Sequence, residues 1–354
     1  MACPGCEIIP TLQNAGKLYI APRLDHTRAK VHRQLNQAGW TVSREEGEVL
    51  AITINEGQTG ALLDDLSLML SRPELDNCPS LLLPSEARFG LHQLRAMEPL
   101  GVLVARQENS WLGDLLREER LQMHFQPILH ADSGTEVFAY EALARGIARD
   151  GSTISPGQMF PAARAAELMY HIDRAARVAA IRQAHEHGIS ENVFINFNPT
   201  SLYDPVFCLR TTFDEVERLG TSPEHYVFEV VETDLIEEPA HLDAILQEYR
   251  RHGFRVALDD LGAGYGSLDL MQKLRPDFVK LDRELVDGVS NDEYLASITS
   301  RLIDMARSLG VKVIAEGIET RADWAWLQGH SVDLVQGFYF ARPAATPPRI
   351  KELP

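Results

Sequence analysis

Short apolar runs alternate with helix-like stretches along the chain from about residue 121 onward. Eight runs have the length and the content of β-branched and aromatic residues that strands favour: 123–129, 137–141, 193–196, 226–229, 255–259, 278–280, 311–316 and 334–340. Apolar residues at helical spacing lie between them, at 161–187, 242–252, 268–274, 294–309 and 322–328. This alternation, over about 225 residues, is typical of a (β/α)8 barrel.

The connection between the first two predicted strands is short. It consists of 131–136 and contains Gly134, which is hairpin spacing rather than the length of a helical crossover. We therefore expect an α/β protein with a TIM-like (β/α)8 barrel that opens with one antiparallel strand pair. An open, doubly wound sheet is the alternative, and it fits the hairpin less well.

The region before the barrel has a mixed pattern. Strand-like runs and helical spacing alternate there without a barrel-like repeat, at 17–21, 26–39, 49–54, 61–70 and 101–105, of which 26–39 and 61–70 are helical. We expect a small α+β domain over 1–106, which we interpret as sensory or regulatory.

An amphipathic helix is predicted to connect this domain to the barrel. It covers 107–120 and carries an apolar stripe made of Trp111, Leu112, Leu115 and Leu116. The expected domain order is thus 1–106, the linker helix 107–120, the barrel 121–345 and a C-terminal tail 346–354.

The charge balance limits the partners. The chain has 34 Lys and Arg against 51 Asp and Glu, a net charge of -17. Such a surface repels DNA, RNA and anionic membranes. No apolar run approaches the ~18 residues of a membrane helix, and the first residues do not look like a secretory signal, so we expect a cytoplasmic protein.

Two of the four cysteines, Cys3 and Cys6, form a C-x-x-C pair near the start of the sequence. A zinc site would need two further ligands, and the sequence marks none. Metal or redox use of the pair stays open beside the simpler interpretation of reduced thiols.

The predicted barrel strands end in polar residues of similar chemistry. These are Glu141, Asn196, Glu229, Asp259 with Asp260, Lys280, Glu316 and Gln336. The C-terminal ends of barrel strands meet on one face, where active sites are built. Acids, amides and a lysine dominate these positions, which favours a functional cluster over ordinary loop beginnings.

Five of these side chains are carboxylates, and Lys280 can offset only one of them. Packed together without counterions, some would have to bind protons. Two divalent cations would neutralise them, and oxygen ligands that include an amide suit Mg²⁺ or Mn²⁺. Such a pair can activate water and steady a displacement at phosphorus. A lysine base beside Mg²⁺-bound carboxylates also describes an enolase-like barrel enzyme, although Asn196 argues against it.

Seven colinear motifs lie along 120–345. They read HFQPI at 124–128 followed by EALAR at 141–145, INFNP at 195–199, FEVVE at 228–232, ALDDLGAGY at 257–265, VKLDR at 279–283, IAEGIE at 314–319 and QGFYF at 336–340. In order and spacing this set resembles the EAL domains, the cyclic di-GMP phosphodiesterases. The resemblance implies hydrolysis of one phosphodiester bond of cyclic di-GMP, which yields linear pGpG and lowers the level of this second messenger.

The resemblance also implies roles for single residues. Glu141, Asn196, Glu229 and Asp259 would bind one metal ion, whereas Asp260 and Glu316 would serve a second ion or its water. Lys280 would hold the attacking water or offset phosphate charge. The ligand itself would be contacted by Gln126 and Arg145. Residues with less defined roles are Asp173, which reaches a guanine or only forms a helix ion pair, and Glu319 and Gln336, which face the ligand or support a metal ligand.

The segment 259–266 resembles the loop that couples metal binding to dimerisation in this family, and Glu232 resembles the acid that anchors that loop. The resemblance therefore implies a homodimer through the barrel. Leu261, Ala263 and Gly266 depart from the usual loop pattern, which we expect to affect loop stiffness rather than chemistry. A catalytically inactive receptor for cyclic di-GMP is the main alternative. Degenerate members usually lose an acid of the cluster, and none is missing here.

Overall fold

The computed structural model describes residues 8–87, 89–231, 239–261 and 267–350. Its contacts divide the chain into two compact units. One contains Leu121–Ser155 and Asp173–Pro354, and the other contains Glu7–Arg120 and Pro156–Ile172.

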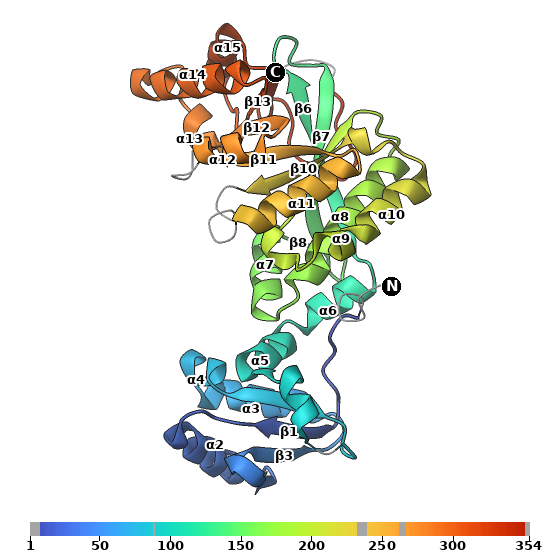
Figure 1. Ribbon diagram of the computed structural model, residues 1–354, viewed down its shortest axis with the longest axis vertical. Coiled ribbons are helices and arrows are strands. Elements are labelled where there is room, and N and C mark those ends of the chain that lie inside the picture. Colours follow the sequence, from blue (N-terminus) through green and yellow to red (C-terminus); the bar gives the residue numbers. More distant parts are fainter. Residues whose placement is uncertain (1–7, 88, 232–238, 262–266, 351–354) are drawn as a thin grey trace. The chain divides into compact units, whose positions relative to one another are not determined.

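The first unit is a closed barrel of eight strands (Figure 1). The strands are β6 (Leu121–His130), β7 (Val137–Ile147), β9 (Asn192–Asn196), β10 (Tyr226–Val231), β11 (Arg255–Leu261), β12 (Phe278–Leu281), β13 (Lys312–Ala315) and β14 (Leu334–Val335). They follow one another around the barrel from β7 through β9 to β14, and β6 closes it by pairing with both β14 and β7. A short strand, β8 (Thr153–Ile154), pairs antiparallel with the end of β7.

Strand β6 runs antiparallel to both of its neighbours, whereas the other barrel pairings are parallel. This confirms the expected antiparallel opening. The hairpin turn depends on Gly134, which has φ 64°, and a Cβ at that position would lie 2.4 Å from the Trp324 ring. Trp324 Nε1 also donates to the Ala131 carbonyl, which fastens the turn to a late helix.

Helices connect the parallel strands. They are α8 (Met169–Glu186), α9 (Pro205–Cys208), α10 (Arg210–Leu219), α11 (Pro239–Arg251), α12 (Ser267–Leu274), α13 (Arg283–Val286), α14 (Glu293–Ser308) and α15 (Arg321–Gly329). The single helix expected over 161–187 is wrong. Two helices, α7 (Pro156–Ala165) and α8, occupy that region, and between them Glu167 has φ 54°, a value that interrupts a helix. The last strand is shorter than expected and ends at Val335.

One apolar residue from each of the eight strands fills the interior of the barrel. The layer consists of Ile128, Ala139, Phe194, Val227, Ala257, Phe278, Ile314 and Leu334. All eight are essentially inaccessible to solvent. This packed layer fills the barrel interior below the next inward-facing positions of the strands.

The second unit is built on an antiparallel sheet in the order β2-β3-β1-β4-β5. Its strands are β1 (Gly16–Ile20), β2 (Val42–Arg44), β3 (Leu50–Ile54), β4 (Pro79–Leu83) and β5 (Glu98–Pro99). Its α-helices are α2 (Asp25–Gln37), α3 (Thr59–Met69), α4 (Arg72–Asp76), α5 (Leu100–Glu108), α6 (Ser110–Arg117) and α7.

The strand expected at 101–105 is wrong, because this segment is helix α5. Leu100, Leu103 and Val104 lie at helical spacing and pack into the same core as the strands β1 and β3. A break at Asn109 separates α5 from α6, so the stretch expected as one linker helix begins in the first and continues in the second.

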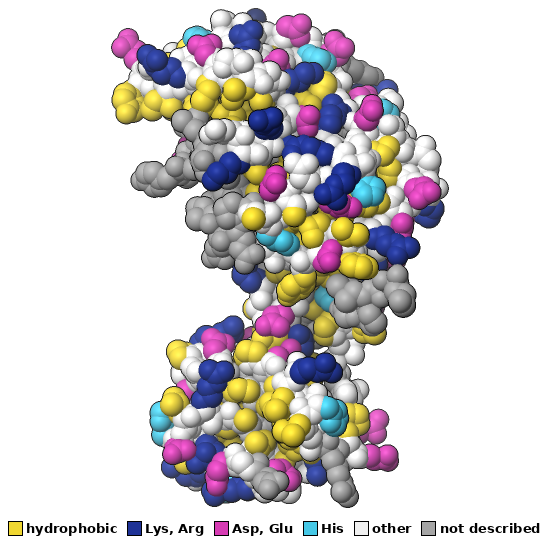
Figure 2. Space-filling model, in the orientation of Figure 1, with side chains coloured by type: hydrophobic (Ala, Val, Ile, Leu, Met, Phe, Trp, Pro, Cys, Tyr) yellow, Lys and Arg dark blue, Asp and Glu magenta, His cyan; other side chains and the backbone are white. Residues whose placement is uncertain are grey.

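Acidic and basic side chains are interspersed on the visible face of the molecule (Figure 2). Among the described residues, we find no helix with the length and hydropathy to cross a bilayer.

Candidate active site

The second inward-facing layer of the barrel is entirely polar. It begins two residues beyond the apolar layer on each strand, and because side chains alternate along a strand, residues two apart face the same side. Two residues after Ala139, Phe194 and Val227 are Glu141, Asn196 and Glu229. The same step on the remaining strands gives Asp259, Lys280, Glu316 and Gln336, and on the antiparallel β6 it leads back from Ile128 to Gln126. We call these eight residues the polar layer.

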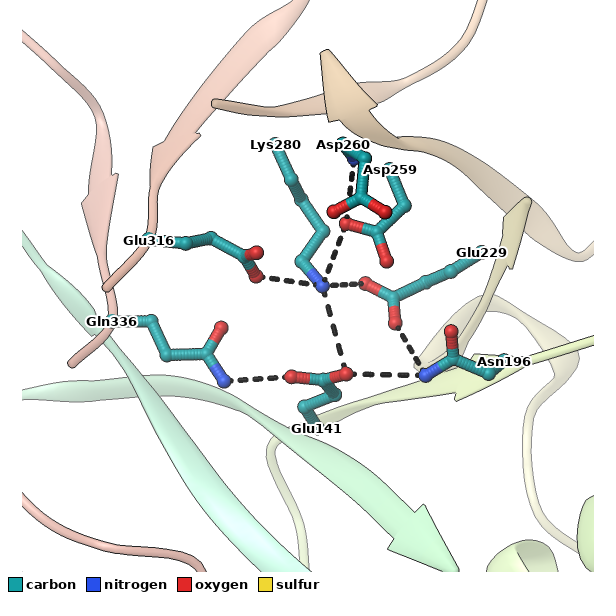
Figure 3. A network of polar contacts seen from close by, with 8 residues as sticks. All are labelled: Glu141, Asn196, Glu229, Asp259, Asp260, Lys280, Glu316 and Gln336. Carbon is teal, nitrogen blue, oxygen red and sulfur yellow. Dashed lines mark hydrogen bonds and ion pairs between the residues drawn. The ribbon is translucent and has the colours of Figure 1, made fainter. Parts of the chain in front are cut away.

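Lys280 lies at the centre of the polar layer (Figure 3). Its Nζ is 2.7 Å from Glu316 Oε1 and 2.9 Å from Glu229 Oε1. Asp259 Oδ1 is 3.2 Å away and Glu141 Oε1 is 3.6 Å away. One ammonium group thus contacts four carboxylates from four different strands or strand ends.

Two amide side chains orient the carboxylate of Glu141. Gln336 Nε2 donates to Glu141 Oε2 at 2.7 Å, and Asn196 Nδ2 donates to Glu141 Oε1 at 3.1 Å. Asn196 Nδ2 also donates to Glu229 Oε2 at 3.2 Å. Glu141 is not at a strand end as expected, because β7 continues to Ile147. Its place in the polar layer results from its register beside Gln126 on β6.

A second group of oxygens lies at one side of the polar layer. Asp259, Asp260 and Glu316 offer carboxylate oxygens that all lie within 4.8 Å of one another. Asp260 adopts φ 56°, and its backbone N–H donates to Asp259 Oδ1 at 3.0 Å. This left-handed backbone is uncommon for a non-glycine residue and is often found at functional sites.

Burial dominates the electrostatics of the cluster. It raises the pKa of both Glu229 and Glu316 well above the usual value, although Lys280 opposes the rise. Burial, together with the charges of Asp259 and Asp282, also raises the pKa of Asp260 to about 6. For Lys280, burial acts to lower the pKa, but the surrounding carboxylates outweigh it and raise the pKa well above the usual value.

These residues fit divalent cations. One lysine cannot neutralise five carboxylates that lie in or beside the polar layer, and the repulsion among these carboxylates adds to burial in raising the pKa values of Glu229, Asp260 and Glu316. The donors are carboxylate and amide oxygens, which hard cations prefer. In addition, Gln336 Oε1 is buried and has no hydrogen-bond partner among the described residues. The residues that could hold the ions are Glu141, Asn196, Glu229, Asp259, Asp260 and Glu316.

A pocket of about 190 Å³ opens beside the polar layer. Gln126, Glu141, Glu316 and Gln336 line its inner part, and the exposed Glu319 lies at its rim. Gln126 Nε2 donates to the Ala341 carbonyl at 3.3 Å.

Arg283, which is not among the site residues predicted from the sequence, lines the same pocket. Its Nη2 is 3.1 Å from Glu319 Oε1 and 3.2 Å from Asp287 Oδ2. The signal was present, because Arg283 closes the motif that begins at Val279 and contains Lys280. Phe338 also lines the pocket, with the Arg342 guanidinium 4.2 Å from its ring centre.

Arg145 lies on β7, four residues beyond Glu141 and hence on the same side of the strand. It is half-buried, and its Nη1 donates to the Ala144 carbonyl at 2.8 Å. Burial lowers the pKa of the Arg145 guanidinium, and the negative charge of Glu141 opposes this. The group is therefore a cation held at the edge of an acidic cluster.

Asp173 is not part of the polar layer. It is buried on α8, where its Oδ2 is 3.2 Å from Arg177 Nη2 and its Oδ1 accepts from the Asn198 backbone N–H at 2.7 Å. Glu232, the expected loop anchor, lies outside the described residues, as do Cys3 and Cys6.

A family model and several known proteins are similar to the larger part of the chain. A family model described as the EAL domain matches residues 109–343. The chain is 30% identical over 239 residues to an Escherichia coli (strain K12) protein named probable cyclic di-GMP phosphodiesterase PdeB, covering 65% of this chain and 44% of that protein. It is 28% identical over 310 residues to the cyclic di-GMP phosphodiesterase NbdA of Pseudomonas aeruginosa, covering 81% and 38%. The chain thus spans less than half the length of these curated relatives.

Solved structures give the same picture. The c-di-GMP-bound form of a standalone versatile EAL protein from Vibrio cholerae O395 is 32% identical, with a TM-score of 0.59, and the match covers 65% of this chain and 95% of that chain. BlrP1 of Klebsiella pneumoniae, solved as a manganese and cyclic di-GMP complex, is 27% identical with a TM-score of 0.58. That match covers 93% of this chain and 96% of that chain.

Proposed function

The chain belongs to the EAL domain family, and from this premise we propose that its barrel is a divalent-cation-dependent phosphodiesterase that hydrolyses cyclic di-GMP to linear pGpG. The observation that carries the proposal is the polar layer, in which four carboxylates converge on Lys280 and two amides hold the carboxylates of Glu141 and Glu229. No acid of the set that the family resemblance implies is missing from the sequence.

Two Mg²⁺ or Mn²⁺ ions per barrel belong to this proposal. Glu141, Asn196, Glu229 and Asp259 would hold one ion, and Asp260 with Glu316 would serve the second. When bound, the cations would lower the pKa of a water molecule and stabilise negative charge on the phosphate oxygens. The carboxylates have a further task, because the barrel strands fix them before substrate arrives and little reorganisation is needed during the reaction.

The reaction replaces one bond at phosphorus by another. Water gives up one proton as its oxygen forms a bond to the phosphorus atom, and the bond from phosphorus to the ribose 3′ oxygen breaks. The 3′ oxygen leaves as a hydroxyl after taking up a proton, and the phosphate remains on the 5′ oxygen of pGpG. Lys280 lies among four carboxylates and would orient the attacking water or offset phosphate charge.

Binding and positioning of the substrate would involve the rim of the polar layer. Arg145 carries a fork of N–H donors that matches phosphate oxygens. Gln126 lies beside Glu141 across the β6–β7 pair and would contact the ligand from the opposite strand. Gln336 and Glu319 would complete this side of the site, Gln336 by holding Glu141 in place.

The rest of the proposal concerns the whole chain. We propose that residues 1–106 are a sensory or regulatory domain, that 107–120 link it to the barrel at 121–345, and that 346–354 form a tail. Two barrels would associate as a homodimer in the cytoplasm. Support for the dimer comes from the likeness of the 259–266 sequence to the family's dimerisation loop.

Product analysis tests the activity. The full chain is incubated with cyclic di-GMP and Mg²⁺, and the products are separated by chromatography, with parallel samples in excess EDTA. We expect pGpG with Mg²⁺ and none in EDTA. Saturable binding of cyclic di-GMP without cleavage would indicate a receptor instead, and full turnover in EDTA would contradict the cation-dependent mechanism.

A further inference from the structure

A cavity of about 730 Å³ lies at the opposite end of the barrel strands from the polar layer. It is bounded by the first residues of three neighbouring strands, Arg255 of β11, Phe278 of β12 and Lys312 of β13. The last part of α12 and the last part of α14 form its sides. Its size is within the range of pockets that hold small organic ligands.

The charge of the cavity contrasts with that of the chain. Three cationic side chains and one carboxylate line it, Arg255, Arg275, Lys312 and Asp277, whereas the chain as a whole carries -17. Asp277 is already engaged, because its Oδ2 accepts from the Val256 backbone N–H at 2.8 Å. Among the described residues, no carboxylate lies within ion-pair distance of Arg275 or Lys312. Asp277 and Glu224 act on the charge of Arg255, and the Lys312 ammonium lies 5.2 Å from the centre of the Phe138 ring, but neither Arg275 nor Lys312 is paired with a described carboxylate.

Arg255 is oriented by its neighbours. Its Nη2 donates to Asn192 Oδ1, and its guanidinium lies 5.4 Å from the centre of the Phe278 ring. Its Nε is buried and has no hydrogen-bond partner in the described part of the chain. A held guanidinium with an unused buried donor is suited to an anionic oxygen.

The turn that carries Arg275 is also held. Arg250 Nη2 donates to the carbonyl oxygens of Leu274 and Arg275, and Arg275 adopts φ 45°. The backbone that presents the second guanidinium is therefore fixed by contacts of its own.

Most of the remaining lining is apolar. Met271 comes from α12 and Met305 from α14, and the other lining residues are Gln272, Pro276, Leu309, Gly310 and Val311. Methionine side chains adjust to ligands of different shape. We propose that this cavity binds a small anion with an apolar or aromatic body, of the size of a nucleoside monophosphate. The cationic end would take the phosphate or carboxylate, and the methionines would cover the body.

The test uses the methyl resonances of the methionines in the full chain, labelled with ¹³C. Met271 and Met305 report on the cavity, and each is assigned with a Met→Leu variant. Met123, on the barrel strand β6, and Met159, on α7, report on the rest of the molecule. The probes are AMP, adenosine and inorganic phosphate, which separate the need for the charge from the need for the body. No turnover is measured, so failure of this proposal and failure of the proposed phosphodiesterase activity are independent.

We expect AMP to shift the Met271 and Met305 resonances saturably, with adenosine and phosphate about tenfold weaker or more. The double substitution Arg275→Gln with Lys312→Gln should raise the apparent dissociation constant of AMP about tenfold. The matched control Arg301→Gln alters an exposed arginine of α14 that does not line the cavity, and it should change nothing. Unchanged Met123 and Met159 resonances would show that the variants are folded.

Three results would overturn the proposal. One is the absence of any shift of Met271 and Met305 with AMP or phosphate up to about 10 mM, the limit of weak specific binding. Another is equal binding of adenosine and AMP. The third is full retention of AMP binding by the folded double variant.

Discussion

The barrel contains two neighbouring layers of inward-facing side chains on the same strands. One layer is apolar, and the other is polar and charged. The lower layer is apolar from strand to strand, and the rings of Phe194 and Phe278 are in contact within it. The polar layer lies two residues further along and contains Lys280 among four carboxylates. Both layers face the barrel interior and are carried by the same strands.

With the function proposed for the polar layer, a shift of one inward-facing position along the strands separates residues for stability from residues for chemistry. Burying Phe194 stabilises the fold, since apolar burial contributes about 25 cal/mol per Å². Burying Glu229 costs free energy unless cations surround it, because the interior solvates charge poorly. A substitution in one layer should therefore act on stability, and a substitution in the other should act on activity.

The largest effect should come from Glu141 in the polar layer. Glu141→Ala removes a carboxylate that contacts Lys280, Asn196 and Gln336 and that would bind metal. We expect turnover of cyclic di-GMP to fall roughly ten-thousandfold, about 5.5 kcal/mol of transition-state stabilisation, while the melting temperature stays close to that of the wild type. Steady-state kinetics and thermal unfolding measure the two quantities on the same sample.

The matched control for this variant is Glu136→Ala, which removes an exposed carboxylate of the β6–β7 hairpin. It should leave turnover unchanged. If Glu141→Ala kept more than about a tenth of wild-type turnover, the polar layer would not be the catalytic site.

The lower layer should respond in the opposite way. Phe194 is fully buried and stacks edge-on against Phe278, with ring centres 5.1 Å apart. Phe194→Ala should reduce the free energy of unfolding by about 3–5 kcal/mol through the cavity that it leaves. Denaturant titration measures the loss, and turnover per folded molecule should change far less than in Glu141→Ala. A stable but inactive Phe194→Ala protein would contradict the separation of the two layers.

Much of this arrangement could be predicted from the sequence. Alternating strand and helix patterns predicted the barrel, because the spacing of apolar residues in a strand or a helix is a local property of the sequence. The short 131–136 connection predicted the antiparallel opening. The members of the polar layer were also identifiable, since Asn196, Glu229 and Lys280 follow apolar runs. Their shared geometry was less visible, because Glu141 lies within β7 and only the register with β6 shows its level in the barrel.

The failures have physical reasons. The run at 101–105 is short, apolar and rich in valine, which suits a buried strand and a buried helix equally well. Its neighbours decided the outcome, because Leu100, Leu103 and Val104 complete an apolar core on one face of α5. The break between α7 and α8 rests on the backbone of Glu167, which no sequence pattern marked. Similarly, Asp173 could not be placed, because its partners Asn198 and Ser201 are distant in sequence.

Divalent cations should stabilise the folded protein by binding to the carboxylates in and beside the polar layer. Mg²⁺ would relieve the repulsion among Asp259, Asp260 and Glu316, and binding to the folded state alone stabilises it by mass action. At a concentration of Mg²⁺ about a hundred times the dissociation constant, the gain is about 2.7 kcal/mol. Thermal unfolding with Mg²⁺ and with EDTA should differ by several degrees.

This shift in melting temperature has its own control. Asp259→Asn removes a charge where the two proposed metal sites meet, so its shift with Mg²⁺ should be much smaller than that of the wild type. An Mg²⁺ shift of full size in Asp259→Asn would place the cation site elsewhere in the chain.

The smallest effect should come from Arg145, which lies on the inward side of β7 about 13 Å along the strand from Glu141. It belongs to neither layer, and it is proposed to bind substrate phosphate rather than metal. Arg145→Ala should raise the KM for cyclic di-GMP about tenfold, or about 1.4 kcal/mol, with a smaller loss in kcat. Arg145→Lys should recover part of the loss, because it restores the charge without the fork of donors.

The control is Arg149→Ala, which alters an exposed arginine four residues further along and should leave KM unchanged. If Arg145→Ala lowered kcat as strongly as Glu141→Ala did, with KM unaltered, Arg145 would act in the chemical step, and the functional part of the barrel would extend beyond the polar layer.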